Sequence, residues 1–393
     1  MKKLNLLIIC LLTSYVFFAQ NKNNKVDSLF NLIEKNKKMN NDSIVIWGTE
    51  LLKVSNETKD DTIRYKASKK ISYYYLRNRI FDSVKKYDML MLTTARKIDC
   101  LKVMSSLQNQ AAYFNNVGLK DSALYVLERA KRIGHNNLKS KTKEDSLKKI
   151  NSILYIETAI VKNYFKDKEF EKALELSYSN LNTSNKYGIT KFLPYNFFYL
   201  GLINLELGNL DEALKYYQKE FELSLKQENP YMKGYALIHL GNVFYEKEDI
   251  PVAKEYYVKA NTLFEENNYL KGKLSSKRKL FSIYEKEENY GQASKIGEDY
   301  ISMYLKTGQL DNYLASFFIK LGRVYHKAGN LLKAREYIEK GLGYASKYKN
   351  KDNVNIINEA YITYKELGDY KMALENHEIL TELRDSLLLN ELT

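Results

Sequence analysis

The sequence predicts an all-α protein, a solenoid of about nine helical hairpins with a period of about 40 residues. The first observation is a small residue that returns at this period along most of the chain. The second is the apolar pattern within each repeat, with three- and four-residue spacing interrupted by a short Gly, Asn, Asp or Lys cluster. The third is the lack of alternating apolar and polar runs that would indicate strands. A lone hairpin cannot bury its apolar face, so neighbouring hairpins must stack.

The repeated small residue is alanine, and from Ala173 to Ala373 it returns at intervals of about 40 residues. The seven positions are Ala123, Ala173, Ala213, Ala253, Ala293, Ala334 and Ala373. Weaker copies centre on Ser43 and Ser83, and only the interval from Ala123 to Ala173 is clearly longer. Small side chains are needed where two helices cross closely. We therefore expect these alanines at the contacts within the hairpins.

The N-terminus predicts an exported protein. Lys2 and Lys3 precede an apolar run that ends near Ala19, which is the pattern of a signal peptide over residues 1–19. The run is short for a membrane span of about 20 residues. A periplasmic or secreted protein follows from cleavage near Ala19, with membrane anchoring through an uncleaved N-terminus as the alternative. Residues 20–25 are expected to form a short linker.

The rest of the chain, residues 26–393, is expected to form the solenoid, with weaker units over 26–130 and regular units over 151–393. A basic insert of about residues 131–150 separates them. Nine Lys or Arg occur from Lys120 to Lys149 against four acids. Insertions in solenoids map to loops on one edge and often carry binding. The insert is therefore either a binding loop or, the favoured interpretation, a solvated linker beside a longer helix.

One repeat illustrates the predicted hairpin. Its first helix covers about Tyr195 to Leu207, because Pro194 suits a first helical turn, where its missing N–H goes unused. Gly208-Asn209 then turns the chain. The second helix places Ala213, Tyr217 and Phe221 on one stripe. The sequence thus predicts two antiparallel helices in each unit.

These repeats resemble tetratricopeptide repeats, whose pattern holds a Leu-Gly pair, an aromatic residue three positions on, a small residue and a later aromatic residue. The Leu-Gly pair is matched at Leu200-Gly201, Leu240-Gly241 and Leu321-Gly322. The first aromatic residue is matched at Phe244, Tyr284, Tyr325 and Tyr364. The later aromatic residue is matched at Tyr217 and Tyr257. The resemblance extends from about Val26 to the C-terminus and implies a right-handed superhelix with a concave binding surface. The family's usual period is about 34 residues, so these hairpins are longer.

The sequence predicts no catalytic, cofactor-binding or metal-binding residue. The histidines lack partners at metal-ligand spacing, and the common nucleophile and phosphate-loop motifs are missing. A net charge of +14 favours acidic partners. Nucleic acid is an unsuitable partner for an exported chain without a recognition motif. We therefore expect a protein or peptide partner and no enzymatic activity.

The predicted concave groove combines aromatic, amide and cationic side chains. It comprises Tyr195, Phe198, Tyr235, Asn242, Tyr245, Arg278, Arg323 and His326. Tyrosine and asparagine can hydrogen-bond a peptide backbone, and arginine can pair with a carboxylate. For any one of the charges, simple solvation of the groove is the favoured interpretation.

Two functions follow. The first is a non-enzymatic scaffold that binds a peptide or protein segment in the groove. The second is the periplasmic sensor portion of a signalling regulator, because the layout resembles exported portions of Bacteroidetes-type tetratricopeptide regulators whose kinase or DNA-binding output lies outside this chain. The last helix presents Leu380, Leu383, Leu387 and Leu388 without a polar cap. This leaves open a membrane-associated or partner helix at the C-terminus; oligomerisation also stays open.

Overall fold

The computed structural model describes residues 24–36, 42–137, 142–308, 312–345 and 351–392, which are almost entirely helical and contain no strand. The chain divides into two units, Met1–Ile203 and Asn204–Thr393. The predicted signal peptide lies outside the described residues, as does most of the predicted linker. Within the described ranges, no helix has the length and apolar character needed to cross a bilayer. The predicted all-α class is confirmed.

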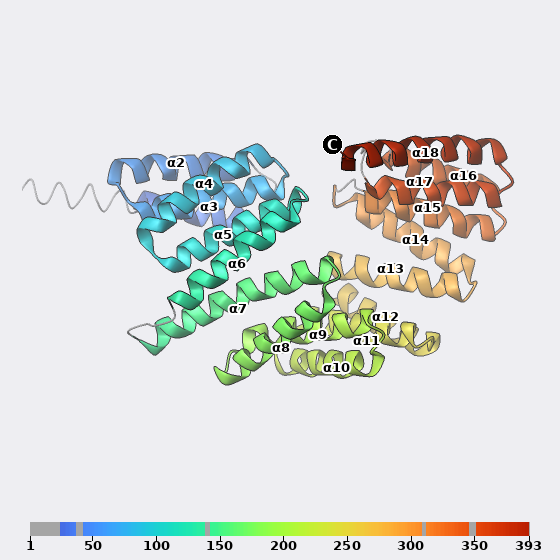
Figure 1. Cartoon of the computed structure of the whole chain (residues 1–393). Helices are drawn as coiled ribbons and strands as arrows, with labels where there is room; N and C mark the ends of the chain where they lie inside the picture. The colour runs from blue at the N-terminus through green and yellow to red at the C-terminus, as the bar shows by residue number, and fades with distance from the viewer. Residues whose placement is uncertain (1–23, 37–41, 138–141, 309–311, 346–350, 393) are drawn as a thin grey trace, which may run out of the picture. The chain divides into compact units, whose positions relative to one another are not determined.

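The first unit consists of consecutive helices (Figure 1). After a helical segment at residues 24–36 come α2 (Ser43–Thr58), α3 (Asp61–Arg77), α4 (Phe81–Ile98), α5 (Cys100–Asn116), α6 (Lys120–Asn136), α7 (Lys143–Lys166), α8 (Phe170–Lys186) and the short 3-10 helix η1 (Thr190–Phe192). The helix α9 (Leu193–Glu206) begins in this unit. Consecutive helices pack against each other, and α5 also contacts α3 and α7. The odd-numbered helices are thus the first helices of successive hairpins.

The second unit continues the same scheme. Its helices are α10 (Leu210–Lys226), α11 (Pro230–Glu246), α12 (Ile250–Glu266), α13 (Leu270–Lys286), α14 (Tyr290–Leu305), α15 (Asn312–Lys327), α16 (Leu331–Ala345), α17 (Lys351–Glu366) and α18 (Tyr370–Leu392). Again the odd-numbered helices contact one another, α11 with α13 and α15 with α17.

The turns between helices follow a regular spacing. Residues with positive φ end successive helices, in equal steps along the chain, at Gly208, Glu228, Glu248, Asn268, Glu288 and Gly308. At Gly329, φ is 79°, a left-handed conformation that glycine adopts without a steric penalty. Asn330 follows, and its side-chain oxygen accepts a hydrogen bond of 3.1 Å from the Lys333 backbone N–H. Between Gly208 and Gly308 the turns therefore divide the repeats into halves of equal length.

The repeated alanines lie inside the helix contacts. All seven are between 0% and 4% exposed. In the first two repeats, buried Ile44 and Val84 take this place, one residue after Ser43 and Ser83. The helices cross closely here, since a Cβ on Gly322 would lie 2.9 Å from the Ala334 carbonyl oxygen. A larger side chain at Ala334 would separate the two helices of this hairpin.

The basic insert contributes to a longer helix. Helix α7 begins at Lys143 and contains 24 residues, whereas α8 contains 17. Thr142 caps it, accepting a 3.1 Å hydrogen bond from the Asp145 backbone N–H. Residues 138–141 of the insert lie outside the described ranges. The extra length of α7 matters below, because α7 forms one wall of a hollow.

Candidate functional site

Two of the eight predicted groove residues lie on α9 in the first unit. Tyr195 is 53% exposed and lines a hollow described below. The rings of Phe198 and Tyr199 pack edge to face, with centroids 5.0 Å apart. Only Tyr195 of this pair reaches the hollow.

Arg323, Asn242 and Arg278 make polar or cation–π contacts within the second unit. The Arg323 guanidinium forms an ion pair of 2.8 Å with Glu285. Asn242 accepts a 2.9 Å hydrogen bond from the Tyr257 hydroxyl. The Arg278 guanidinium lies over an aromatic ring at 5.5 Å. These groups would have to exchange existing contacts in order to bind a ligand.

The remaining three are also enclosed. Tyr245 lies under an ammonium group at 5.0 Å, and Tyr235 packs against the Phe264 ring at 5.3 Å. Burial raises the pKa of Tyr235 to about 12, so its phenol stays protonated. His326 has a buried Nδ1 atom that finds no hydrogen-bond partner among the described residues.

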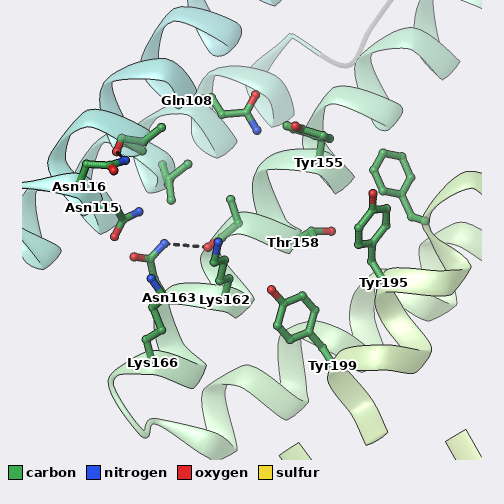
Figure 2. A pocket seen from close by; sticks show the side chains of 15 residues that line it. Gln108, Asn115, Asn116, Tyr155, Thr158, Lys162, Asn163, Lys166, Tyr195 and Tyr199 are labelled. Atoms are coloured by element: carbon green, nitrogen blue, oxygen red, sulfur yellow. Dashed lines mark hydrogen bonds between the residues drawn. The ribbon is translucent and has the colours of Figure 1, made fainter. Parts of the chain in front are cut away.

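A hollow of about 590 Å³ lies in the first unit and is lined by residues of α5, α6, α7, η1 and α9. We call it the main hollow; Figure 2 shows it from close by. Its lining combines carboxamides, tyrosines and two lysines: Gln108, Ala111, Ala112, Asn115, Asn116, Leu127, Tyr155, Thr158, Ala159, Lys162, Asn163, Lys166, Phe192, Tyr195 and Tyr199. Ligand sites commonly have volumes of about 300 to 1,000 Å³. The main hollow is therefore large enough for several residues of a peptide.

The carboxamides in the main hollow are held by their own helices or are free to bind. Asn163 is buried, and its Nδ2 donates to the Ala159 carbonyl at 2.8 Å, which leaves Oδ1 as an acceptor. Asn116 donates in the same way to Ala112 at 2.8 Å. The side chain of Gln108 makes no hydrogen bond to a described residue. A carboxamide can donate and accept at once, which matches the two groups of a peptide bond.

The charge in the main hollow is positive. Lys162 and Lys166 line it without any lining carboxylate, and neither forms an ion pair with a described residue. Burial lowers the pKa of Lys166, and the neighbouring charges of Lys162 and Lys120 add to this shift. Lys120 already pairs with Asp167 at 2.7 Å. An anion bound between the two lysines would relieve their repulsion.

Aromatic side chains from α9 form the wall of the main hollow that faces α7. Tyr195 and Tyr199 project from α9 toward the main hollow, facing Thr158 and Lys162 on α7 (Figure 2). Burial, followed by the neighbouring Tyr195, raises the pKa of Tyr199 to about 12. Its phenol therefore stays a neutral hydrogen-bond donor. Such rings offer apolar area and a polar tip at once, as is common at binding surfaces.

The residues of α5 and α7 were not singled out from the sequence, although they leave a readable signal. Tyr155, Thr158, Lys162 and Lys166 follow three- and four-residue spacing, so they share one face of α7. Polar residues occupy this stripe, where an apolar stripe would indicate core. Reading polar stripes as well as apolar ones would have marked this face.

The main hollow offers binding groups and no metal cluster. Among the residues that the structure places, no group of three or more His, Cys, Asp or Glu side chains could hold a metal ion. What the arrangement can do is hold a peptide group with its carboxamides, an acidic group with its lysines, and apolar parts with its rings.

The sequence comparisons support the repeat assignment. Residues 197–226 and 315–348 match the family model described as tetratricopeptide repeat. No curated protein matches the chain in sequence.

Several solved structures share the fold. The apo form of the quorum sensor NprR from B. thuringiensis is similar, with a TM-score of 0.59, 14% identity and coverage of 93% of this chain and 99% of that one. A signal transduction ATPase with a tetratricopeptide repeat sensor, from Pyrococcus horikoshii, gives a TM-score of 0.57 at 16% identity, covering 88% of this chain and 53% of that one.

A third structure is the Rap conjugation gene regulator of plasmid pLS20 in complex with the Phr* peptide. Its TM-score is 0.53 at 12% identity, covering 83% of this chain and 95% of that one. At these identities the likeness concerns the fold. The chain is thus a helical repeat protein with the fold of tetratricopeptide-repeat solenoids, and two of its segments match that repeat in sequence.

Proposed function

We propose that this chain is a non-enzymatic scaffold that binds a peptide or protein segment in the main hollow of its first unit. The observation that carries the proposal is the pair Lys162 and Lys166, which lie without a paired carboxylate beside carboxamides and tyrosines. The fold supports it, because stacked hairpins present extended surfaces for other chains. The similar Rap regulator is named as a complex with a peptide.

We propose further that the ligand is acidic. Lysines that form no ion pair with a described residue and line a hollow without a carboxylate attract acidic segments and hold them by charge-assisted hydrogen bonds. The carboxamides of Gln108 and Asn163 would meet the ligand's backbone, whatever its sequence. The charge of the ligand would then determine its affinity, whereas the backbone contacts would contribute to binding whatever the ligand's sequence.

A sensor portion of a signalling regulator is the second candidate. Two of the similar structures are named as sensors, which favours this role for a ligand-binding solenoid. The basic and apolar N-terminal residues 1–19 support export, and we place the binding outside the cytoplasm on that ground. In this role, peptide binding would be the input signal.

The test compares the two candidate surfaces. A pool of fluorescein-labelled acidic peptides is titrated against the wild-type protein and against Lys162→Ala with Lys166→Ala. We expect binding at least about tenfold weaker in the variant, because hydrogen bonds to charged groups contribute about 1.5 to 3 kcal/mol. The double variant Arg278→Glu, Arg323→Glu tests the groove predicted in the second unit.

The control is Lys215→Ala, which removes an exposed lysine on α10 that pairs with Glu212. Circular dichroism checks that all variants stay helical. Unchanged binding in the α7 double variant would contradict the main hollow as the site. Weaker binding in the Arg278 and Arg323 variant alone would move the site to the second unit.

A further inference from the structure

We infer that the ligand of the main hollow is an extended segment of about six or seven residues lying along α5 and α7, with an acidic residue at one end and an apolar residue at the other. This inference rests on the proposed function. It adds the length of the ligand, its orientation and a second subsite.

The second subsite is a smaller hollow of about 210 Å³, which we call the side hollow. It is lined by Leu101, Met104, Ser105, Gln108, Asn151, Ser152, Tyr155, Ile156, Lys191 and Phe192. Three of these residues, Gln108, Tyr155 and Phe192, also line the main hollow. The two hollows therefore adjoin, and one ligand can occupy both.

The order of the lining residues fixes the direction of this combined site. On α5 the side hollow uses residues 101 to 108 and the main hollow residues 108 to 116. On α7 the corresponding spans are 151 to 156 and 155 to 166. Both helices thus run from the side hollow to the main hollow. A ligand that fills both must lie along the helices rather than across them.

The same numbers give the length of the ligand. From Leu101 to Asn116 and from Asn151 to Lys166, each helix advances about 15 residues, or about 22 Å at 1.5 Å per residue. An extended chain covers at most about 3.3 to 3.6 Å per residue, so about six or seven residues span this distance. A shorter segment would reach only one hollow.

The chemistry of the two ends differs. The main hollow ends at Lys162 and Lys166, which favour an acidic residue. In the side hollow, the partly exposed Leu101 and the exposed ring of Tyr155 offer apolar surface to a ligand side chain, whereas Met104 and Ile156 are almost fully buried. The ammonium group of Lys191 is already placed over the Phe192 ring, 5.8 Å from its centroid. The middle, at Gln108 and Tyr155, would contact the ligand's backbone.

The experiment uses fluorescein-labelled peptides that carry one Glu and one Leu, separated by one to six Ser or Asn residues. Fluorescence anisotropy with the full chain measures the affinity of each. We expect the tightest binding with four or five residues between Glu and Leu. With only one residue between them, affinity should fall at least tenfold, because only one hollow can be filled.

Two variants separate the ends. Lys162→Ala with Lys166→Ala should abolish the preference for Glu over Gln and leave the preference for Leu over Ser. Ser152→Phe should fill the side hollow from a partly exposed position and abolish the Leu preference alone. Lys215→Ala should change neither preference, and circular dichroism should show the same helicity for all proteins.

Equal affinities at every spacing, or a Leu preference that survives Ser152→Phe, would overturn the inference and leave the proposed function standing. If no peptide of this series binds and the acidic pool does not bind either, both fall. A spacing optimum that either variant shifts or removes would establish the two-ended site.

Discussion

Helices α8 and α12 hold the same place in the repeat, two periods apart, but α12 buries apolar side chains where α8 buries polar ones. Each contacts the first helices on either side, and each starts its buried face with the repeated alanine, Ala173 or Ala253. The positions i+4, i+7 and i+11 from this alanine complete the face. In α12 they hold Tyr257, Ala260 and Phe264, and in α8 they hold Ser177, Asn180 and Ser184.

The contacts of the two faces differ accordingly. Phe264 is fully buried and packs so closely on α13 that a Cβ on Gly272 would lie 2.2 Å from its ring. In α8, Ser184 accepts a 3.2 Å hydrogen bond from Asn196 of α9. Asn180 is 1% exposed, and neither polar atom of its side chain has a partner among the described residues.

The difference teaches that repeats of one chain need not contribute equally to stability. The stability of a solenoid is roughly a sum over repeats and their interfaces. A buried polar group without a partner costs about 1 to 3 kcal/mol. The packing of α8 should therefore contribute less than that of α12. Helix α9, to which α8 is hydrogen-bonded, also carries Tyr195 and Tyr199 of the main hollow.

The largest expected effect is on the apolar face. Phe264→Ala should lower the free energy of unfolding by about 3 to 5 kcal/mol, because it leaves a cavity between α11 and α13. Ser184→Ala, at the same place in α8, should cost less, about 1 to 3 kcal/mol, because the buried amide of Asn196 loses its hydrogen-bond acceptor. Urea unfolding followed by circular dichroism measures both. Equal losses would show that the two faces contribute alike.

A smaller effect of opposite sign is expected in α8. Asn180→Leu replaces two unpartnered polar atoms with an apolar group of similar shape, and should raise the free energy of unfolding by about 1 kcal/mol. Ala260→Asn, the reverse change in α12, should destabilise. Hydrogen exchange should slow in α8 and α9 of the first variant. Faster exchange there would mean that Asn180 has a stabilising role.

The smallest effect concerns pH. In α4, Asp88 holds the place of Tyr257 and is 2% exposed. Burial raises its pKa, against the opposing hydrogen bonds from Ser72 and Asn109. Below the ordinary pKa of aspartate both states are protonated. Above it the unfolded chain loses the proton first, so stability falls as pH rises, until the raised folded pKa is passed.

Asp88→Asn should therefore flatten the dependence of stability on pH in the acidic range. Thermal unfolding from pH 4 to pH 7 checks this, with Asp82→Asn, on the exposed side of the same helix, as the control. An unchanged slope in the Asp88 variant would assign the pH dependence to other groups.

Most of the fold could be predicted from the sequence, because it rests on local patterns. Ala213 and Ala334 mark helix contacts by their spacing alone, and both are fully buried. The first two repeats show the limit of this approach. There the larger Ile44 and Val84 occupy the buried position. A pattern based on small residues therefore selects Ser43 and Ser83, which lie one residue before the buried positions.

The candidate site was harder to predict, because it depends on which partners each side chain meets. Sequence alone suggests Arg323 as a free cation, whereas the structure pairs it with Glu285, 38 residues away. Lys166 looks like any surface lysine in the sequence. Only the fold places it beside Lys162 in a hollow without a carboxylate. Tyr195 is the one predicted residue that lines this hollow.

The evenly spaced positive-φ turns carry a consequence for how such chains change over generations. Since the two helices of a regular hairpin and their turns have equal length, a duplication or deletion of one whole repeat preserves every helix boundary and every buried face. Gene segments of that size can be copied or lost between the turns from Gly208 to Gly308, because these turns recur in equal steps. The molecule can thus grow or shrink by whole modules, while the polar residues of one module change freely to suit a new ligand.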